Sequence, residues 1–209
     1  MKRINLFMIL AAAALMMGFG PNEEKTVLVG HFLNTADVPE FVTLFDDDTE
    51  EVVANVPVKD GTFRYDVTSD KTTIMSLRFG KDGNEWRESF VPTGDTVRYE
   101  IDGLKTVAEV FSPETSLNFP TRDFAAFCKN ALPRLKTDST TTSELRDYCT
   151  RMIDEHPSDV LGYTALIHAS FANLLGDEWK ALLNKMSPEI QAKPRVQAMK
   201  AWIDDFPKE

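Results

Sequence analysis

The sequence predicts a segregated α+β protein: an antiparallel β-sandwich or partly open barrel comes first and an all-α helical region follows. Two observations predict this class. Short segments that alternate apolar and polar residues recur between turn signals as far as residue 111, which is typical of antiparallel strands. After residue 112 the apolar residues recur at helical spacing instead. We therefore expect a β domain over residues 26–111 and a helical domain over residues 119–206.

Eight segments have the length and the alternation of strands. Turn signals separate them, among them Gly80-Lys81-Asp82-Gly83, which we interpret as a hairpin turn, and Thr93-Gly94-Asp95. No long helical crossover lies between the segments, so we expect antiparallel pairing and no parallel sheet. The expected strands are Thr26–Leu33, Phe41–Asp46, Glu51–Val58, Thr62–Val67, Thr73–Phe79, Trp86–Val91, Thr96–Ile101 and Val107–Phe111.

The segment Val52–Val67, VVANVPVKDGTFRYDV, has the clearest strand pattern. Its apolar residues alternate up to an Asp-Gly pair and alternate again after it, which predicts two strands joined by a tight turn. A two-residue Asp-Gly turn and a four-residue loop over Lys59–Thr62 would both place Val58 opposite Phe63. In the two-residue case Pro57 would occupy a hydrogen-bonded position without an N–H to donate, so we favour the four-residue loop.

Apolar stripes with a period of 3.6 residues predict the helices of the second part. The first helix should end near Pro133, and Thr141 and Glu144 have the spacing of a capping box before the second. We expect Asp177 to cap a later helix, Ser187-Pro188 to open another and Pro194 to interrupt it. The stripes comprise Phe124, Phe127, Cys128 and Ala131; Leu145, Tyr148, Cys149, Met152 and Ile153; Val160–Leu175; Trp179, Leu182, Leu183 and Met186; and Val196, Met199, Ile203 and Phe206.

Residues 1–20 have the layout of a secretory signal peptide, because two basic residues precede an apolar run, Leu6–Met17, and small residues follow it. A spanning helix needs about 20 apolar residues, more than this run has. No cysteine lies near its end, so we do not expect a lipoprotein. We expect a periplasmic or cell-envelope protein without membrane insertion after cleavage. Pro21 directly follows Gly20 and disfavours cleavage at that point. An uncleaved membrane anchor is therefore the alternative to a cleaved signal peptide.

The chain is acidic, with 23 basic and 33 acidic residues and a formal net charge of −10. Cleavage of the signal peptide removes two basic residues and no acidic one, which leaves −12. A strongly acidic protein without a basic cluster repels phosphate backbones and anionic membrane surfaces. We therefore expect no nucleic-acid partner. The sequence leaves the oligomeric state open.

Cys128 and Cys149 lie on the apolar faces of two neighbouring predicted helices. In an oxidising compartment they would close a loop of roughly 20 residues, worth about 3 kcal/mol in the loop-entropy model. The alternative is a pair of buried free thiols that act as small apolar side chains. A catalytic redox pair typically has Cys-X-X-Cys spacing, which lowers the pKa of one thiol. Cys128 and Cys149 lack this spacing, so a catalytic redox role is disfavoured.

Metal and cofactor chemistry has little support in the sequence. The acidic run Asp46–Asp48 lacks the spacing and the distal glutamate of an EF-hand, so we expect a solvated hairpin turn there. The histidines, His31, His156 and His168, are scattered without metal-ligand spacing. We expect no cofactor and no metal site.

No catalytic residues are assigned. Gly-x-Ser-x-Gly and Ser-x-x-Lys are absent, and paired carboxylates carry no weight because 33 acidic residues always permit some pair. A hydrolase therefore stays open only as a third class. Trp86 is the one aromatic residue that we single out as a candidate platform for a sugar or peptide, because core packing explains Phe90 and Tyr99 more simply.

Five segments together resemble a known family. In the β part these are VLVGHFLN, VPVKDGTFRYDV and SLRFGKDGNEWRESFVPTGDTVRYEIDG, and in the helical part HPSDVLGYTALIHA and LLNKMSPEIQAKPRVQAMKAWI. The first three resemble the N-terminal domain of unknown function that precedes thioredoxin-like modules in many secreted Bacteroidota proteins. The last two resemble the linker helices that lead into the thioredoxin fold of those proteins.

The resemblance implies an accessory role. In the longer relatives a Cys-X-X-Cys in the thioredoxin-like module performs thiol–disulfide exchange, and this sequence has no such motif. We therefore expect a non-catalytic secreted accessory or binding protein whose partner is an unknown protein, peptide or glycan. The alternative is a redox-associated protein that uses Cys128 and Cys149 or assists a separate thioredoxin-like partner.

Overall fold

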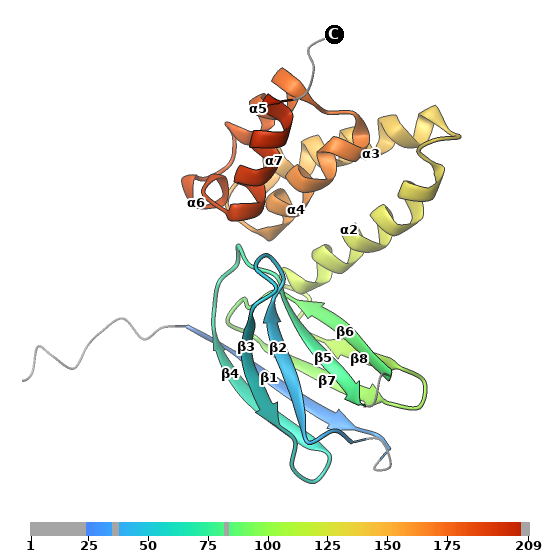
Figure 1. Cartoon of the computed structure of the whole chain (residues 1–209), viewed down its shortest axis with the longest axis vertical. Coiled ribbons are helices and arrows are strands. Elements are labelled where there is room, and N and C mark those ends of the chain that lie inside the picture. Colours follow the sequence, from blue (N-terminus) through green and yellow to red (C-terminus); the bar gives the residue numbers. More distant parts are fainter. Residues whose placement is uncertain (1–23, 35–37, 82–83, 206–209) are drawn as a thin grey trace, which may run out of the picture.

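The computed structural model describes residues 24–34, 38–81 and 84–205. The predicted signal peptide and Phe206 lie outside the described residues. Figure 1 shows the strands gathered at one end and the helices at the other, in the order in which the chain runs. This arrangement confirms the segregated α+β class.

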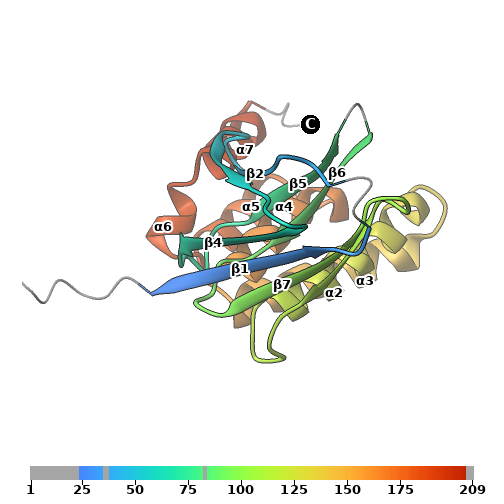
Figure 2. The same cartoon turned by 90° about the horizontal axis from the view of Figure 1, so that it is seen from below.

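Eight strands form two four-stranded sheets, ordered β4-β1-β7-β8 and β3-β2-β5-β6. Two separate sheets make the β part a sandwich and not a barrel. The view from below shows β4, β1 and β7 side by side in the first sheet (Figure 2). The strands are β1 Lys25–Phe32, β2 Phe41–Asp46, β3 Val52–Pro57, β4 Thr62–Thr68, β5 Met75–Lys81, β6 Asn84–Phe90, β7 Thr96–Asp102 and β8 Val107–Phe111.

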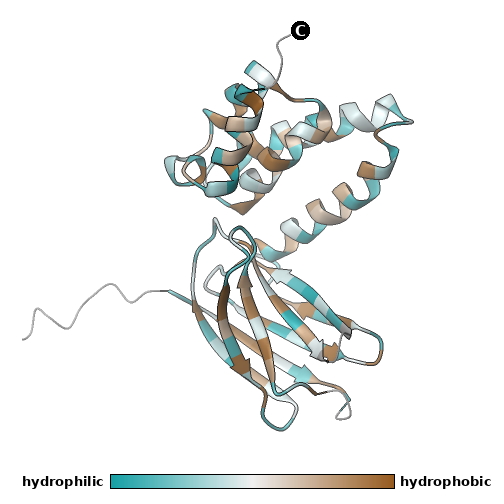
Figure 3. Cartoon of the chain, in the orientation of Figure 1, coloured by the Kyte–Doolittle hydropathy of each residue, from teal (hydrophilic) through white to brown (hydrophobic). Residues whose placement is uncertain are grey.

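The sandwich core consists of alternate residues of each strand, as the period-2 pattern predicts. Leu28, Leu44, Leu77 and Val97 come from four different strands and are all fully buried between the sheets. Brown and teal residues alternate along the strands in Figure 3 for the same reason. The intervening residues form the two outer faces of the sandwich.

One pairing contradicts the purely antiparallel prediction. Strands β1 and β7 run parallel, with Val27 level with Thr96 and Phe32 level with Ile101. Parallel neighbours need a long crossover connection, which is often a helix. Here the strands β2–β6 supply the crossover, so the absence of a helix between the strands did not exclude a parallel pair.

The predicted four-residue loop after β3 is also wrong. Lys59 and Thr62 exchange two backbone hydrogen bonds, of 2.8 and 2.9 Å, around a two-residue turn. Both residues of the turn, Asp60 and Gly61, have positive φ angles, as a type I′ turn requires.

Pro57 does not conflict with this turn, because β3 and β4 separate into different sheets beyond the Lys59–Thr62 bridge. Pro57 lies opposite Phe41 of β2 instead. Strand β3 is an edge strand, and a proline without an N–H is tolerated there. The segment is therefore a corner between the two sheets and not a paired hairpin.

The helices pack around a second core, separate from the sandwich core. Trp179, Leu145, Ile153 and Phe124 are its largest fully buried side chains. Figure 1 shows α2 leading away from the sandwich and α3 returning along the other helices. The elements are α2 Asn118–Ala131, η2 Leu132–Arg134, α3 Ser139–Glu155, α4 Val160–Ala169, η3 Ser170–Ala172, α5 Gly176–Leu183, α6 Pro188–Gln191 and α7 Pro194–Asp204.

Two predicted caps are wrong and one is confirmed. Asp138 caps α3 by accepting a hydrogen bond of 2.9 Å from the Thr140 N–H, and the Thr141 hydroxyl donates to Asp138 instead of capping. Asp177 lies within the first turn of α5 and is not its cap. Ser187 caps α6, as predicted. For α3, Asp138 and Thr141 both have cap chemistry within one helical turn, so sequence alone did not distinguish them.

Candidate binding site on the sandwich

Cys128 and Cys149 are both buried, and the structure has them as free thiols. Burial raises the pKa of Cys128 to about 11. Burial also raises the pKa of Cys149 to about 12, and the nearby Cys128 adds to this rise. The thiolate is the reactive form of cysteine, so these two thiols are poorly suited to exchange chemistry at neutral pH.

Trp86 belongs mainly to the sandwich core. Its ring centroid lies 5.7 Å from that of Phe79, and its side chain is partly buried against the core. Its Nε1 is buried without a hydrogen-bond partner in the described structure. Strand alternation places residue 86 on the same inward face as Phe90, where the Trp86 ring packs. Its use as a ligand platform stays a prediction.

The acidic turn after β2 is less solvated than predicted, because Thr49 and Glu50 are exposed but Asp48 is not. The Asp48 side chain is only 7% exposed, and it accepts hydrogen bonds from the Tyr163 hydroxyl and from Lys193 Nζ, the latter at 3.2 Å. Lys193 Nζ also lies 3.4 Å from Thr73 Oγ1 and 5.1 Å from the Tyr163 ring centroid. The turn therefore docks the sandwich onto α4 and the start of α7.

A second set of hydrogen bonds fixes α2 to the sandwich. The Asn118 side chain accepts a hydrogen bond of 2.6 Å from the Val91 N–H and donates one of 2.8 Å to the Val91 carbonyl. At the start of α4, the Val160 N–H donates to the Lys71 carbonyl at 2.8 Å. These polar groups satisfy one another's hydrogen-bonding capacity, so we interpret the junction of sandwich and helices as a structural contact.

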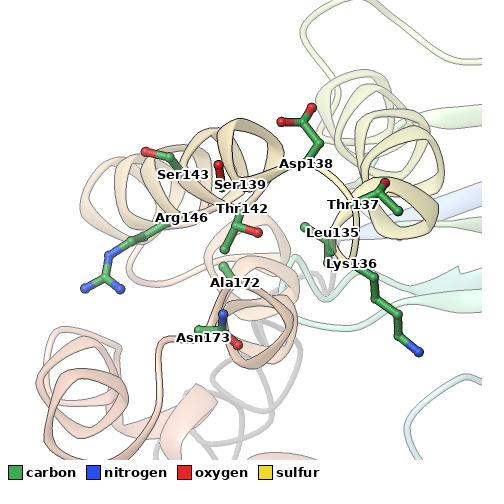
Figure 4. Close-up of a pocket in the computed structure, with 10 residues that line it drawn as sticks. All are labelled: Leu135, Lys136, Thr137, Asp138, Ser139, Thr142, Ser143, Arg146, Ala172 and Asn173. Atoms are coloured by element: carbon green, nitrogen blue, oxygen red, sulfur yellow. The ribbon is translucent and has the colours of Figure 1, made fainter.

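A crevice of about 640 Å³ lies where the α2–α3 connection and the start of α3 approach Asn173. Its polar side chains do not converge: in Figure 4 Asp138, Arg146 and Lys136 point in different directions. Asp138 is occupied as the cap of α3, and Arg146 is paired with Glu178. The crevice therefore lacks a set of groups aimed at one ligand.

A different hollow lies on the outer face of the sheet β3-β2-β5-β6, where side chains form two rows across the strands. The strand registers pair Pro57 with Phe41 and Gly80 with Glu85, and continuing the β2–β5 register two residues past Thr43 and Arg78 brings these pairs into one row. The next row consists of Asn55, Thr43, Arg78 and Arg87. Gly80 has no side chain, so it leaves a gap in the first row.

We name the depression over Gly80, with a volume of about 650 Å³, the Gly80 hollow; it is lined by Val38, Pro39, Glu40, Phe41, Thr43, Arg78, Gly80 and Glu85. Phe41 is 48% exposed on one side of it. The Arg78 guanidinium lies 4.3 Å from the Phe45 ring centroid and 3.6 Å from a Glu85 oxygen. The hollow thus combines an open aromatic ring, a positioned guanidinium and two carboxylates, Glu40 just before β2 and Glu85 on β6.

Sequence reasoning missed this hollow because it assigned Gly80 to a turn. The structure extends β5 through Gly80, whose φ angle is +95°. An isolated glycine at the end of a strand pattern often marks a bulge or a close approach by another group, and this was the available signal. Phe41 lies far from Arg78 and Glu85 in sequence, so no spacing rule connects the three residues.

Within residues 24–34, 38–81 and 84–205, no cluster of three or more histidine, cysteine or acidic side chains is arranged to hold a metal ion. None of the helices in this part of the chain has the length and apolarity to cross a membrane. Comparisons with known protein families and with curated proteins found no match to the chain. The geometry of the sites therefore carries the functional argument.

Proposed function

We propose that the chain is an exported, non-catalytic accessory or binding protein that holds its ligand in the Gly80 hollow. The observation that carries the proposal is the convergence of Phe41, Arg78 and Glu85 around a strand residue without a side chain. The signal-peptide pattern of residues 1–20 supports export to the periplasm or cell envelope. The family resemblance supports an accessory role beside thioredoxin-like proteins.

The hollow suits binding because strands position five of its eight lining residues, Phe41, Thr43, Arg78, Gly80 and Glu85. Binding sites built on strands hold their groups more closely in place than sites built on loops. The Arg78 guanidinium is fixed further by its stacking on the buried Phe45 ring. A ligand would therefore meet groups that are already ordered, which lowers the entropy cost of association.

Arrays of peptides and glycans probed with the purified protein test this proposal. We expect at least one ligand whose binding weakens about tenfold in Phe41→Ala, since aromatic side chains dominate many binding sites. Val53→Ala is the matched control, because Val53 is another exposed apolar residue of the same sheet and does not line the hollow. Ligands that bind both variants like the wild type would contradict the proposal.

The redox-associated alternative is the weaker one, because burial raises the pKa values of both thiols. Alkylation followed by mass spectrometry separates the two roles. A binding protein with buried thiols should be labelled at Cys128 and Cys149 only after unfolding. Rapid labelling of the folded protein at neutral pH, or a disulfide that physiological reductants open, would favour the redox role.

A further inference from the structure

We infer that the Gly80 hollow binds a cationic side chain, arginine or lysine, from a peptide segment of a partner protein. This inference rests on the proposed function and names the chemistry of its ligand. It is carried by a comparison of two phenylalanines on the same outer face, one of which already holds cations from its own chain.

Phe45 shows how this face accommodates a guanidinium. Its ring is buried beneath two arginines, with the guanidinium carbons of Arg78 and Arg87 at 4.3 and 4.7 Å from the ring centroid. Arg87 also forms an ion pair of 2.9 Å with Glu50. An aromatic ring and a nearby carboxylate thus stabilise each cation together, as cation–π and charge–charge attraction predict.

Phe41 has the same kind of surroundings without the cation. It lies on the same face of β2, its ring is about half exposed, and Glu40 and Glu85 line the hollow beside it. Among the side chains that the structure describes, the cation–π contacts involve Phe45, Phe119, Tyr148 and Tyr163 and not the Phe41 ring. A guanidinium or ammonium from another molecule would complete the arrangement.

The charge balance of the hollow favours a cation over an anion. Among the described residues, two carboxylates, of Glu40 and Glu85, and one guanidinium, of Arg78, line it. One added positive charge would neutralise this set, whereas an anion would add to the excess of negative charge. The whole chain carries −10, so long-range attraction also favours the approach of a basic partner.

The remaining walls suit the methylene groups of a long basic side chain. Val38 and Pro39 form the apolar part of the lining. Lysine and arginine place their aliphatic stems along apolar surface while the charged end remains among polar groups. A side chain that enters over Gly80 would therefore contact Val38 and Pro39 along its stem and place its charge near Phe41 and Glu85.

Titration with two short peptides tests the inference. The probe is acetyl-Gly-Gly-Arg-Gly-Gly-amide, and the control peptide carries citrulline, which keeps the shape of arginine but is uncharged. Binding is followed by two-dimensional NMR of the full chain, with the Gly80 amide as reporter. We expect the arginine peptide to bind about tenfold more tightly than the citrulline peptide, and its affinity to fall with added salt.

Variants of the lining residues should change the affinity in opposite directions for a cationic and an anionic ligand. For a cationic ligand, Phe41→Leu and Glu85→Gln should each weaken binding about threefold to tenfold, while Arg78→Gln should leave it unchanged or strengthen it. Glu50→Gln is the matched control, because Glu50 is an exposed carboxylate that does not line the hollow. We expect it to have no effect on the affinity.

Two outcomes would overturn the inference. Preferential binding of acetyl-Gly-Gly-Asp-Gly-Gly-amide that is lost in Arg78→Gln would show that the hollow takes anions, and the proposed function would still stand. No shift of the Gly80 amide at millimolar arginine peptide would reject the cationic ligand altogether. In that case the array comparison of Phe41→Ala with Val53→Ala would decide separately whether the hollow binds anything.

Discussion

The same three chemical components, a carboxylate, a cation and an aromatic ring, occur in two regions of this protein with different consequences. At the junction of sandwich and helices, Asp48 and Lys193 are 7% and 13% exposed and contact the Tyr163 ring or hydroxyl. In the Gly80 hollow, Arg78 and Glu85 are 34% and 48% exposed. Burial, and not the type of residue, distinguishes the two regions.

The difference separates a structural role from a binding role. Buried charges must be paired, because an unpaired charge away from water is very unfavourable, so the junction groups are fully used in holding the two halves together. Exposed pairs contribute little to stability and exchange partners with water and ligands easily. The hollow therefore retains capacity for a ligand that the junction lacks.

The largest expected effect is on the junction. Asp48→Ala leaves the buried Lys193 ammonium without its carboxylate, so we expect the free energy of unfolding to fall by about 3–5 kcal/mol. Urea denaturation measures the change. Glu85→Ala is the control from the hollow, where an exposed pair is worth about 0–1 kcal/mol. Equal losses for both variants would remove the distinction between the two regions.

The fold was largely predictable because periodicity reports burial directly. The alternation over Phe41–Asp46 and Val107–Phe111 gave the strands that the structure has. Periodicity does not report which strands meet, however, so the parallel pair β1–β7 and the separation of β3 from β4 were missed. Strand pairing depends on contacts between segments far apart in sequence, and a local pattern does not contain them.

The sites were harder to predict than the fold, for a related reason. Asp48 looked like a residue of a solvated turn because its partners, Tyr163 and Lys193, lie more than 100 residues further along the chain. The Gly80 hollow forms because Gly80 has no side chain and because Phe41 and Glu85, from other strands, lie around it. A local sequence pattern does not report such neighbours. Trp86 was singled out for its residue type. The sequence already indicated that it points inward, because it lies four positions from Phe90 and therefore on the same face of the strand.

The Tyr163 hydroxyl should have the next largest effect. It donates to the buried Asp48 carboxylate, and hydrogen bonds to charged groups contribute about 1.5–3 kcal/mol. We expect Tyr163→Phe to lower the free energy of unfolding by an amount in that range, measured by urea denaturation. A change close to zero would mean that Lys193 alone satisfies Asp48.

Tyr99→Phe removes the same hydroxyl group as Tyr163→Phe, but we expect it to raise the free energy of unfolding. The Tyr99 side chain is fully buried in the sandwich, and its hydroxyl has no hydrogen-bond partner in the described structure. A buried polar group without a partner is unfavourable, so its removal should raise the free energy of unfolding by about 1 kcal/mol. A loss of stability instead would show that the hydroxyl bonds to a buried water molecule or to another bound group.

The smallest expected effect on stability belongs to the hollow itself. Phe41→Leu should change the free energy of unfolding by less than about 0.5 kcal/mol, because substitutions at exposed positions rarely exceed that. Phe45→Leu, two positions along the same strand, removes a buried ring beneath two arginines and should cost about 1–2 kcal/mol. If Phe41→Leu weakens binding of the arginine peptide about threefold to tenfold while stability stays constant, the exposed ring serves the ligand and not the fold. If instead it destabilises the protein as much as Phe45→Leu does, the ring is part of the sandwich structure, and the contrast between the hollow and the junction fails at this residue.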